Sequence, residues 1–135
     1  MKAVIIRIDG SKEVVDFDRT NSYDVLSAAV DGYIQQAPLD DIGVTMYCNE
    51  EGKIVQLEQN PTATSLWIDQ WSETDVMVGN VICTSSIVDE DGNENGLTDE
   101  QVEYLLNYNR TAKFVGLHEG EPIFVYEETK DKETV

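Results

Sequence analysis

Acidic side chains are the most abundant source of chemistry in this sequence. Of its 135 residues, 27 are Asp or Glu and only 9 are Lys or Arg, so the formal net charge is −18. Carboxylates transfer protons, bind cations or contact basic proteins, and their grouping decides among these roles. The groups fall at expected loop tips, and the acids that we predict to contact a partner are Glu50, Glu51, Asp89, Glu90, Asp91, Glu94, Glu119 and Glu121.

The densest acidic group, residues 89–100, has the spacing of a calcium-binding loop. Oxygen-bearing side chains alternate along its first half, and Glu100 stands where an EF-hand loop carries its last carboxylate ligand. Glu94, however, occupies the sharp-turn position that needs glycine, and the preceding segment has the pattern of a strand instead of a helix. We therefore interpret the loop as a solvated turn that leads into a helix and predict no metal, with calcium binding as the alternative.

No arrangement of residues in the sequence identifies a reaction. His118 is the only histidine, and we interpret it as a surface residue of a terminal hairpin. Carboxylates are so numerous that no acid–base pair stands out. A Gly-rich phosphate loop is absent, and Arg7, Arg19 and Arg110 are scattered along the chain. These observations predict a protein that is not an enzyme and needs no cofactor.

The cysteines and the N-terminus indicate the cellular compartment. Cys48 and Cys83 are far apart and each lies in an apolar run, so we predict two buried, reduced thiols instead of one disulfide. The apolar start of the chain is interrupted by Arg7 and is too short for a signal sequence or a membrane span. We therefore expect a cytoplasmic protein that acts inside its host cell.

The elements that position these side chains begin with a predicted hairpin and a helix. β-Branched runs at 3–8 and 13–17 flank a Gly-containing turn, a pattern that is typical of a β-hairpin. Residues 22–32 then predict a short helix that ends at a glycine and has apolar residues on one side. Extended chain follows up to Pro38.

Two strand predictions follow in the middle of the chain. Residues 44–57 have the pattern of two strands joined by a tight turn, in which Gly52 supplies a positive φ. Residues 75–84 form a Val-rich run, and Gly79 inside it predicts a bulge or a close approach of backbone.

A helix between these strands has a clear start signal. Asn60 accepts hydrogen bonds from free backbone N–H groups, and Pro61 has no N–H to satisfy. The helix runs to about Trp71, which follows Trp67 by one helical turn. We interpret the two tryptophans as a packing face, with a partner-binding patch as the alternative.

The end of the chain predicts a third helix and a hairpin. Residues 98–101 form a capping box, after which Val102, Leu105 and Leu106 give the helix an apolar face. Residues 114–126 then read as two short strands around an acidic turn.

The length and the order of elements define the fold class. The chain is long enough for one domain with a real core, and it lacks a regular βαβ alternation. We predict an α+β fold with a mainly antiparallel sheet and about three short helices. A single core domain spans 1–110, a C-terminal β-hairpin at 111–127 packs on the sheet or extends it, and the charged residues 128–135 form a flexible tail.

Several short motifs are spread along the chain: Met1–Ala3, Tyr33–Ile34, Asn49–Lys53, Asn60–Thr64, Asp75, Val78–Val81 and the Asp-x-Asp-Gly loop at 89–92. Together they resemble a domain-of-unknown-function family that is widespread in bacteriophages, plasmids and other mobile elements. The resemblance covers about residues 1–106 and implies a small accessory protein of a mobile element, without an activity to transfer. Each signature residue also has a structural reason to be there, and a site formed by Glu50, Glu51, Lys53 and Asn60 is the alternative.

The charge and the resemblance together predict the class of partner. Nucleic acids and anionic membranes are polyanions, which excludes unaided binding to either. A duplex as long as this domain carries about 20 phosphates, so acids gathered on one face would imitate its backbone. We predict a non-enzymatic, anti-CRISPR-like or anti-restriction protein that binds the basic nucleic-acid channel of a host defence nuclease. The alternatives are a sponge or regulatory module for a signal nucleotide and a soluble accessory protein; a homodimer also stays open.

Overall fold

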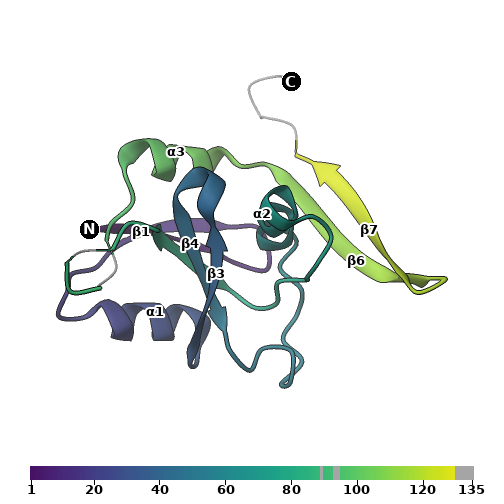
Figure 1. Cartoon of the computed structure of the whole chain (residues 1–135), viewed down its shortest axis with the longest axis horizontal. Helices are drawn as coiled ribbons and strands as arrows, with labels where there is room; N and C mark the ends of the chain where they lie inside the picture. The colour runs from purple at the N-terminus through teal and green to yellow at the C-terminus, as the bar shows by residue number, and fades with distance from the viewer. Residues whose placement is uncertain (89, 93–94, 130–135) are drawn as a thin grey trace.

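Two antiparallel sheets and three α-helices make up the part of the chain that the computed structural model describes, residues 1–88, 90–92 and 95–129 (Figure 1). The larger sheet has the strand order β2-β1-β5-β4-β3, and every neighbouring pair is antiparallel. Its strands are β1 (Lys2–Ile6), β2 (Lys12–Asp16), β3 (Ile34–Leu39), β4 (Val44–Asn49) and β5 (Val81–Ser85). This arrangement confirms the predicted α+β class with a mainly antiparallel sheet.

Helices cover both faces of the five-stranded sheet, with α1 below it and α3 above it in Figure 1. The helices are α1 (Ser22–Val30), α2 (Pro61–Trp71) and α3 (Asp99–Asn107), and a 3-10 turn, η1 (Asp40–Ile42), joins β3 to β4. Neighbouring strand residues point to opposite faces. Accordingly, Ala3 and Tyr47 pack in the cluster between the sheet and α1, whereas Val4 and Met46 pack in the cluster between the sheet and the helices α2 and α3. The central strand β5 is buried along its whole length.

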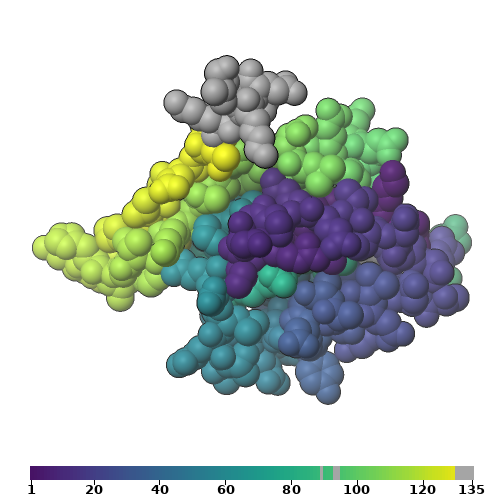
Figure 2. All heavy atoms as spheres, turned by 180° about the vertical axis from the view of Figure 1, so that it is seen from behind, coloured from purple at the N-terminus to yellow at the C-terminus, as the bar shows by residue number. Residues whose placement is uncertain are grey.

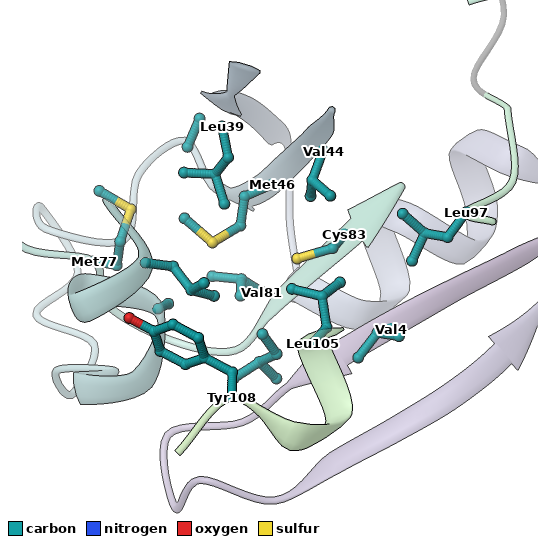
Figure 3. Close-up of a cluster of buried hydrophobic side chains, with 14 residues drawn as sticks. Val4, Leu39, Val44, Met46, Met77, Val81, Cys83, Leu97, Leu105 and Tyr108 are labelled. Carbon is teal, nitrogen blue, oxygen red and sulfur yellow. The ribbon is translucent and has the colours of Figure 1, made fainter. Parts of the chain in front are cut away.

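The larger core cluster lies between the sheet and the helices α2 and α3 (Figure 3). Val4, Met46 and Cys83 rise from the sheet toward Leu105 and Tyr108, which come from α3 and its C-terminal cap. The predicted apolar face of the third helix is confirmed only in part. Leu105 is fully buried and Val102 is half-buried, but Leu106 is exposed.

Both strong helix starts are confirmed at the atomic level. The Asn60 side chain accepts from the Ala63 N–H at 3.0 Å, and Pro61 is the first residue of α2. The Thr98 hydroxyl accepts from the Gln101 N–H at 3.1 Å, and the Gln101 side chain accepts from the Thr98 N–H at 2.9 Å. These caps satisfy N–H groups that the first turn of a helix leaves free.

The prediction of a second strand within residues 44–57 is wrong. Residues 50–56 form successive turns, and Ile54 is 80% exposed. The reason is that β4 already pairs with β3 on one side and β5 on the other, so no edge is left for another strand. Gly52 also has no positive φ; instead a Cβ there would lie 2.9 Å from a Val78 methyl group.

The predicted strand at 75–84 is shorter than expected. Regular pairing begins only at Val81, and Val78 makes an isolated bridge with Gln59. Gly79, which has a φ of 74°, breaks the run between them. The irregularity predicted at Gly79 is thus confirmed as a close approach: it lies before the strand, and a Cβ there would be 2.8 Å from a Leu57 methyl carbon.

The structure describes the two cysteines and the lengths of the helices, the features from which the sequence predicts the cellular compartment. Cys48 and Cys83 are both free, as predicted, but Cys48 is only half-buried. Burial raises the pKa of the Cys83 thiol to about 12. Within the described residues, every helix is too short or too polar for a bilayer crossing.

The second sheet is a hairpin of β6 (Arg110–His118) and β7 (Glu121–Glu128) that lies against α2 and projects from the body (Figures 1 and 2). The Gln59 side chain accepts from the Phe114 N–H at 2.9 Å and donates to the Phe114 carbonyl at 2.8 Å. Nearer the open end of the hairpin, where Tyr126 pairs with Ala112, the Tyr126 hydroxyl donates to the Glu73 carboxylate. Of the tail predicted at 128–135, residues 130–135 lie outside the described residues.

Candidate functional site

The acidic turns predicted as contact sites lie at separate corners of the molecule. Glu50 and Glu51 start the turns that follow β4, and Glu119 and Glu121 lie at the tip of the β6–β7 hairpin. All four side chains are exposed. Figure 1 shows the hairpin tip at the far end of the molecule from the N-terminus.

The remaining predicted acids belong to the connection between β5 and α3. Glu90 and Asp91 are exposed there, whereas Asp89 and Glu94 lie outside the described residues. The end of this connection lies beside the N-terminus, because the Leu97 N–H donates to the Lys2 carbonyl at 2.8 Å. The structure therefore does not bring this loop together with the hairpin tip. In the described part of the chain, no group of three or more His, Cys, Asp or Glu is placed to hold a metal ion.

The alternative grouping around Asn60 is also separated by the fold. Asn60 is fully buried and serves as the cap of α2. Glu50 and Lys53 do share a hollow of about 310 Å³ beside β3 and β4, but the Lys53 ammonium is paired with the Asp75 carboxylate. Asn60 does not line that hollow.

A different set of acids lies together where η1, α2 and α3 meet. Tyr104 lines two adjoining hollows, one shared with Asp41 and Asp69 and the other, of about 450 Å³, shared with Glu100 and Glu103. We call the surface around these hollows the acidic–aromatic face. Of its members, Asp41, Asp69, Glu100, Glu103 and Tyr104 line the hollows, Asp40 and Trp71 adjoin lining residues in the chain, and all seven are exposed.

Hydrogen bonds hold the three elements of this face in place. The Gln70 side chain, on α2, accepts from the Asp41 N–H at 2.7 Å. The Gln101 side chain, on α3, donates to the carbonyls of Ile42 and Gly43 at 3.1 and 2.8 Å. Because side chains of both helices form hydrogen bonds with η1 and the glycine after it, the acids of η1 have a fixed position relative to those of α2 and α3.

The aromatic side chains of the face are equally constrained. Trp71 donates its indole N–H to the Pro38 carbonyl at 2.7 Å, and its ring centroid lies 5.8 Å from that of Trp67. Trp67 in turn donates to the Thr74 hydroxyl at 2.9 Å and packs against the core. The inner tryptophan thus confirms the predicted packing role, while Trp71 is left exposed at the surface.

Asp69 joins the face to the C-terminal hairpin. Its carboxylate accepts from the Tyr108 hydroxyl and from the Arg110 guanidinium, both at 2.7 Å. The Ser65 hydroxyl lies 2.7 Å from the Tyr108 hydroxyl, and the Arg110 guanidinium stands 5.0 Å from the centroid of the Tyr108 ring. One buried phenol therefore links α2, the end of α3 and the start of β6.

This network makes stability sensitive to alkaline pH. Burial, followed by the interactions with Asp69, raises the pKa of the Tyr108 phenol well above its usual range. Its contribution to stability is complete below the unfolded pKa of about 10 and declines as pH rises above that value. We expect the melting temperature of the Tyr108→Phe variant to fall less than that of the wild type between about pH 9 and about pH 11. Equal falls in the two proteins would contradict this assignment.

The sequence carries only a weak signal of the acidic–aromatic face. Its acids come from three segments that are far apart, and each segment alone looks like an ordinary solvated helix side or turn. The available signal is the spacing of Glu100 and Glu103 on the exposed side of the amphipathic helix α3.

The fold and the face define a small α+β protein in which an antiparallel sheet, with helices on both faces, supports an acidic and aromatic surface. The chain belongs to the family described as Domain of unknown function (DUF3846), whose model matches residues 1–110. This confirms the resemblance to a domain-of-unknown-function family. The match ends at the first residue of β6, so the hairpin lies beyond it. No curated protein and no solved structure gives a significant match.

Proposed function

We propose that this protein is a non-enzymatic binding protein whose acidic–aromatic face occupies the basic surface of a protein that handles nucleic acid. Five exposed acids and two exposed aromatic rings, in or beside the two hollows that Tyr104 lines, carry this proposal. A host defence nuclease is the partner class, which makes the protein an anti-CRISPR-like or anti-restriction factor of a mobile element inside the host cell. Neither nucleic acid nor membrane is a ligand, since a net charge of −18 repels both.

Charge and ring placement act at different stages of such binding. Long-range attraction between opposite charges speeds the encounter of the two proteins and weakens as salt is added. Tyr and Trp are the side chains that most often anchor protein interfaces. Because Trp71 is already held by Pro38 and Trp67, little side-chain entropy is lost when a partner covers it.

Displacement of nucleic acid from a panel of host defence nucleases tests the proposal. At low salt, the wild-type protein should release labelled DNA or guide RNA from at least one nuclease. The double variant Asp41→Lys/Glu103→Lys should bind at least about tenfold more weakly, because it reverses two charges on the face.

A charge-matched control separates the face from net charge. Glu50→Lys/Glu51→Lys changes the net charge by the same amount but lies in the turns after β4, and it should retain most of the affinity. Equal losses in both double variants would show that total charge acts instead of the face. Failure of the wild type to displace nucleic acid from any nuclease would overturn the proposal.

A further inference from the structure

The outer edge of β7 has no partner strand in the described part of the chain. β7 pairs with β6 alone, and no strand of the larger sheet joins the hairpin. The edge of β6 is different, since the Gln59 side chain bonds both the N–H and the carbonyl of Phe114. Along β7, alternate N–H and carbonyl groups therefore point away from the hairpin, as on any edge strand.

The middle of β7 lacks the usual protection of an edge strand. Natural edges carry Lys, Pro or bulges that prevent another strand from adding. In β7 the only proline, Pro122, lies near the tip, and four consecutive residues with high strand propensity follow it at 123–126. Three of these are exposed: Ile123, Val125 and Tyr126. A two-stranded hairpin is also marginally stable by itself, so a third strand would stabilise it.

The charges at both ends of β7 determine what can pair with it. Glu121 precedes the apolar run, and Glu127 and Glu128 follow it. A second copy of β7, placed antiparallel in the symmetric register, would put Glu121 opposite Glu128 at each end. Like charges directly opposite each other destabilise a strand pair. A segment with apolar residues in its middle and Lys or Arg near its ends would complement β7, because its apolar residues would face the run at 123–126 and its basic residues the flanking glutamates.

We propose that the outer edge of β7 binds such an extended basic–apolar segment of a partner protein as a third strand. Backbone hydrogen bonds would supply affinity, and the alternating side chains would supply specificity. The inference rests on the proposed function for the basic character of the partner, and it adds where and how that partner is held. Because the family match ends at residue 110, this contact belongs to the part of the chain beyond the family domain.

Hydrogen exchange with a model strand tests the site on the full chain. The probe is a synthetic peptide, Lys-Arg-Val-Ile-Val-Thr-Arg-Lys, and its control has prolines at the two central positions. The probe should slow the exchange of outward-facing N–H groups at 123–126, while the control should not. The two edges of the larger sheet, β2 and β3, serve as internal references and should not change.

Two lysine variants of equal charge locate the contact. Ile123→Lys should weaken peptide binding at least about tenfold, because an edge lysine blocks strand addition. Val115→Lys, at the bulge of β6, should change the affinity less than about twofold. These side chains are comparably exposed, at 41% and 54%. If Ile123→Lys lowers the melting temperature, Glu121→Gln/Glu128→Gln provides a second variant and should also weaken binding.

The outcomes distinguish this inference from the proposed function. Protection at β2 or β3 instead of β7, or equal effects of the two lysine variants, would overturn the β7 site. Self-association that Ile123→Lys abolishes would show a second copy as the occupant and would also overturn it. If the protein displaces nucleic acid from a nuclease but the peptide does not protect β7, the proposed function stands and the β7 site is wrong. If the peptide protects β7 but no nucleic acid is displaced, the β7 site stands and the proposed function is wrong.

Discussion

Replacing Asn60 by Asp should destabilise the protein by about 3–5 kcal/mol, although the two residues are normally equivalent helix caps. Asn60 is fully buried, and its amide N–H groups donate to the carbonyls of Ile6 and Gly79 at 3.0 and 2.9 Å. An Asp carboxylate would keep the cap on Ala63 but would place a buried negative charge against two carbonyl oxygens. A buried acceptor or charge without a partner costs far more than a lost surface hydrogen bond.

The free energy of unfolding of the Asn60→Asp variant, measured in urea, tests this effect, and the Asn21→Asp variant is the control. Asn21 precedes α1 in the same way, but its side chain makes no capping bond and is exposed. The control substitution should change the free energy of unfolding by less than about 1 kcal/mol. Similar small losses in both variants would contradict the role assigned to Asn60.

Leu105→Ala should cost about 3 kcal/mol, and the neighbouring Leu106→Ala well under 1 kcal/mol. Leu105 is 0% exposed and lies in the cluster between α3 and the sheet, whereas Leu106 is 41% exposed. Truncating the first leaves a cavity in a packed core; truncating the second removes contacts that water replaces. Chemical unfolding of both variants checks the difference, and equal losses would mean that α3 is rotated from the orientation described.

The parts of the fold that the sequence predicts well are those determined by local contacts. Asn60 and Thr98 start helices through hydrogen bonds to residues three positions on, so their signals lie within one turn. Whether residues after Gly52 form a strand depends instead on which strands flank β4, and β5 comes from much later in the chain. No pattern near Gly52 contains that information.

The candidate face illustrates the same limit for function. Sequence reasoning chose acids that are adjacent in the chain, such as Glu50 and Glu51, because adjacency is what a sequence displays. The fold also gathers acids such as Asp41, Asp69 and Glu103 from separate elements, whose positions the side chains of Gln70 and Gln101 fix. A surface assembled in this way becomes visible only when the packing of η1, α2 and α3 is known.

The position of β5 has a consequence for how the protein is made. The pairs β1–β2 and β3–β4 are local hairpins that can form as soon as each is synthesised. They become one sheet only when β5, about thirty residues later, inserts between β1 and β4. Until then the edges of β1 and β4 that β5 later covers are also open, and open strand edges are sites of misassociation. Insertion of β5 between β1 and β4 is therefore the step that completes the native sheet.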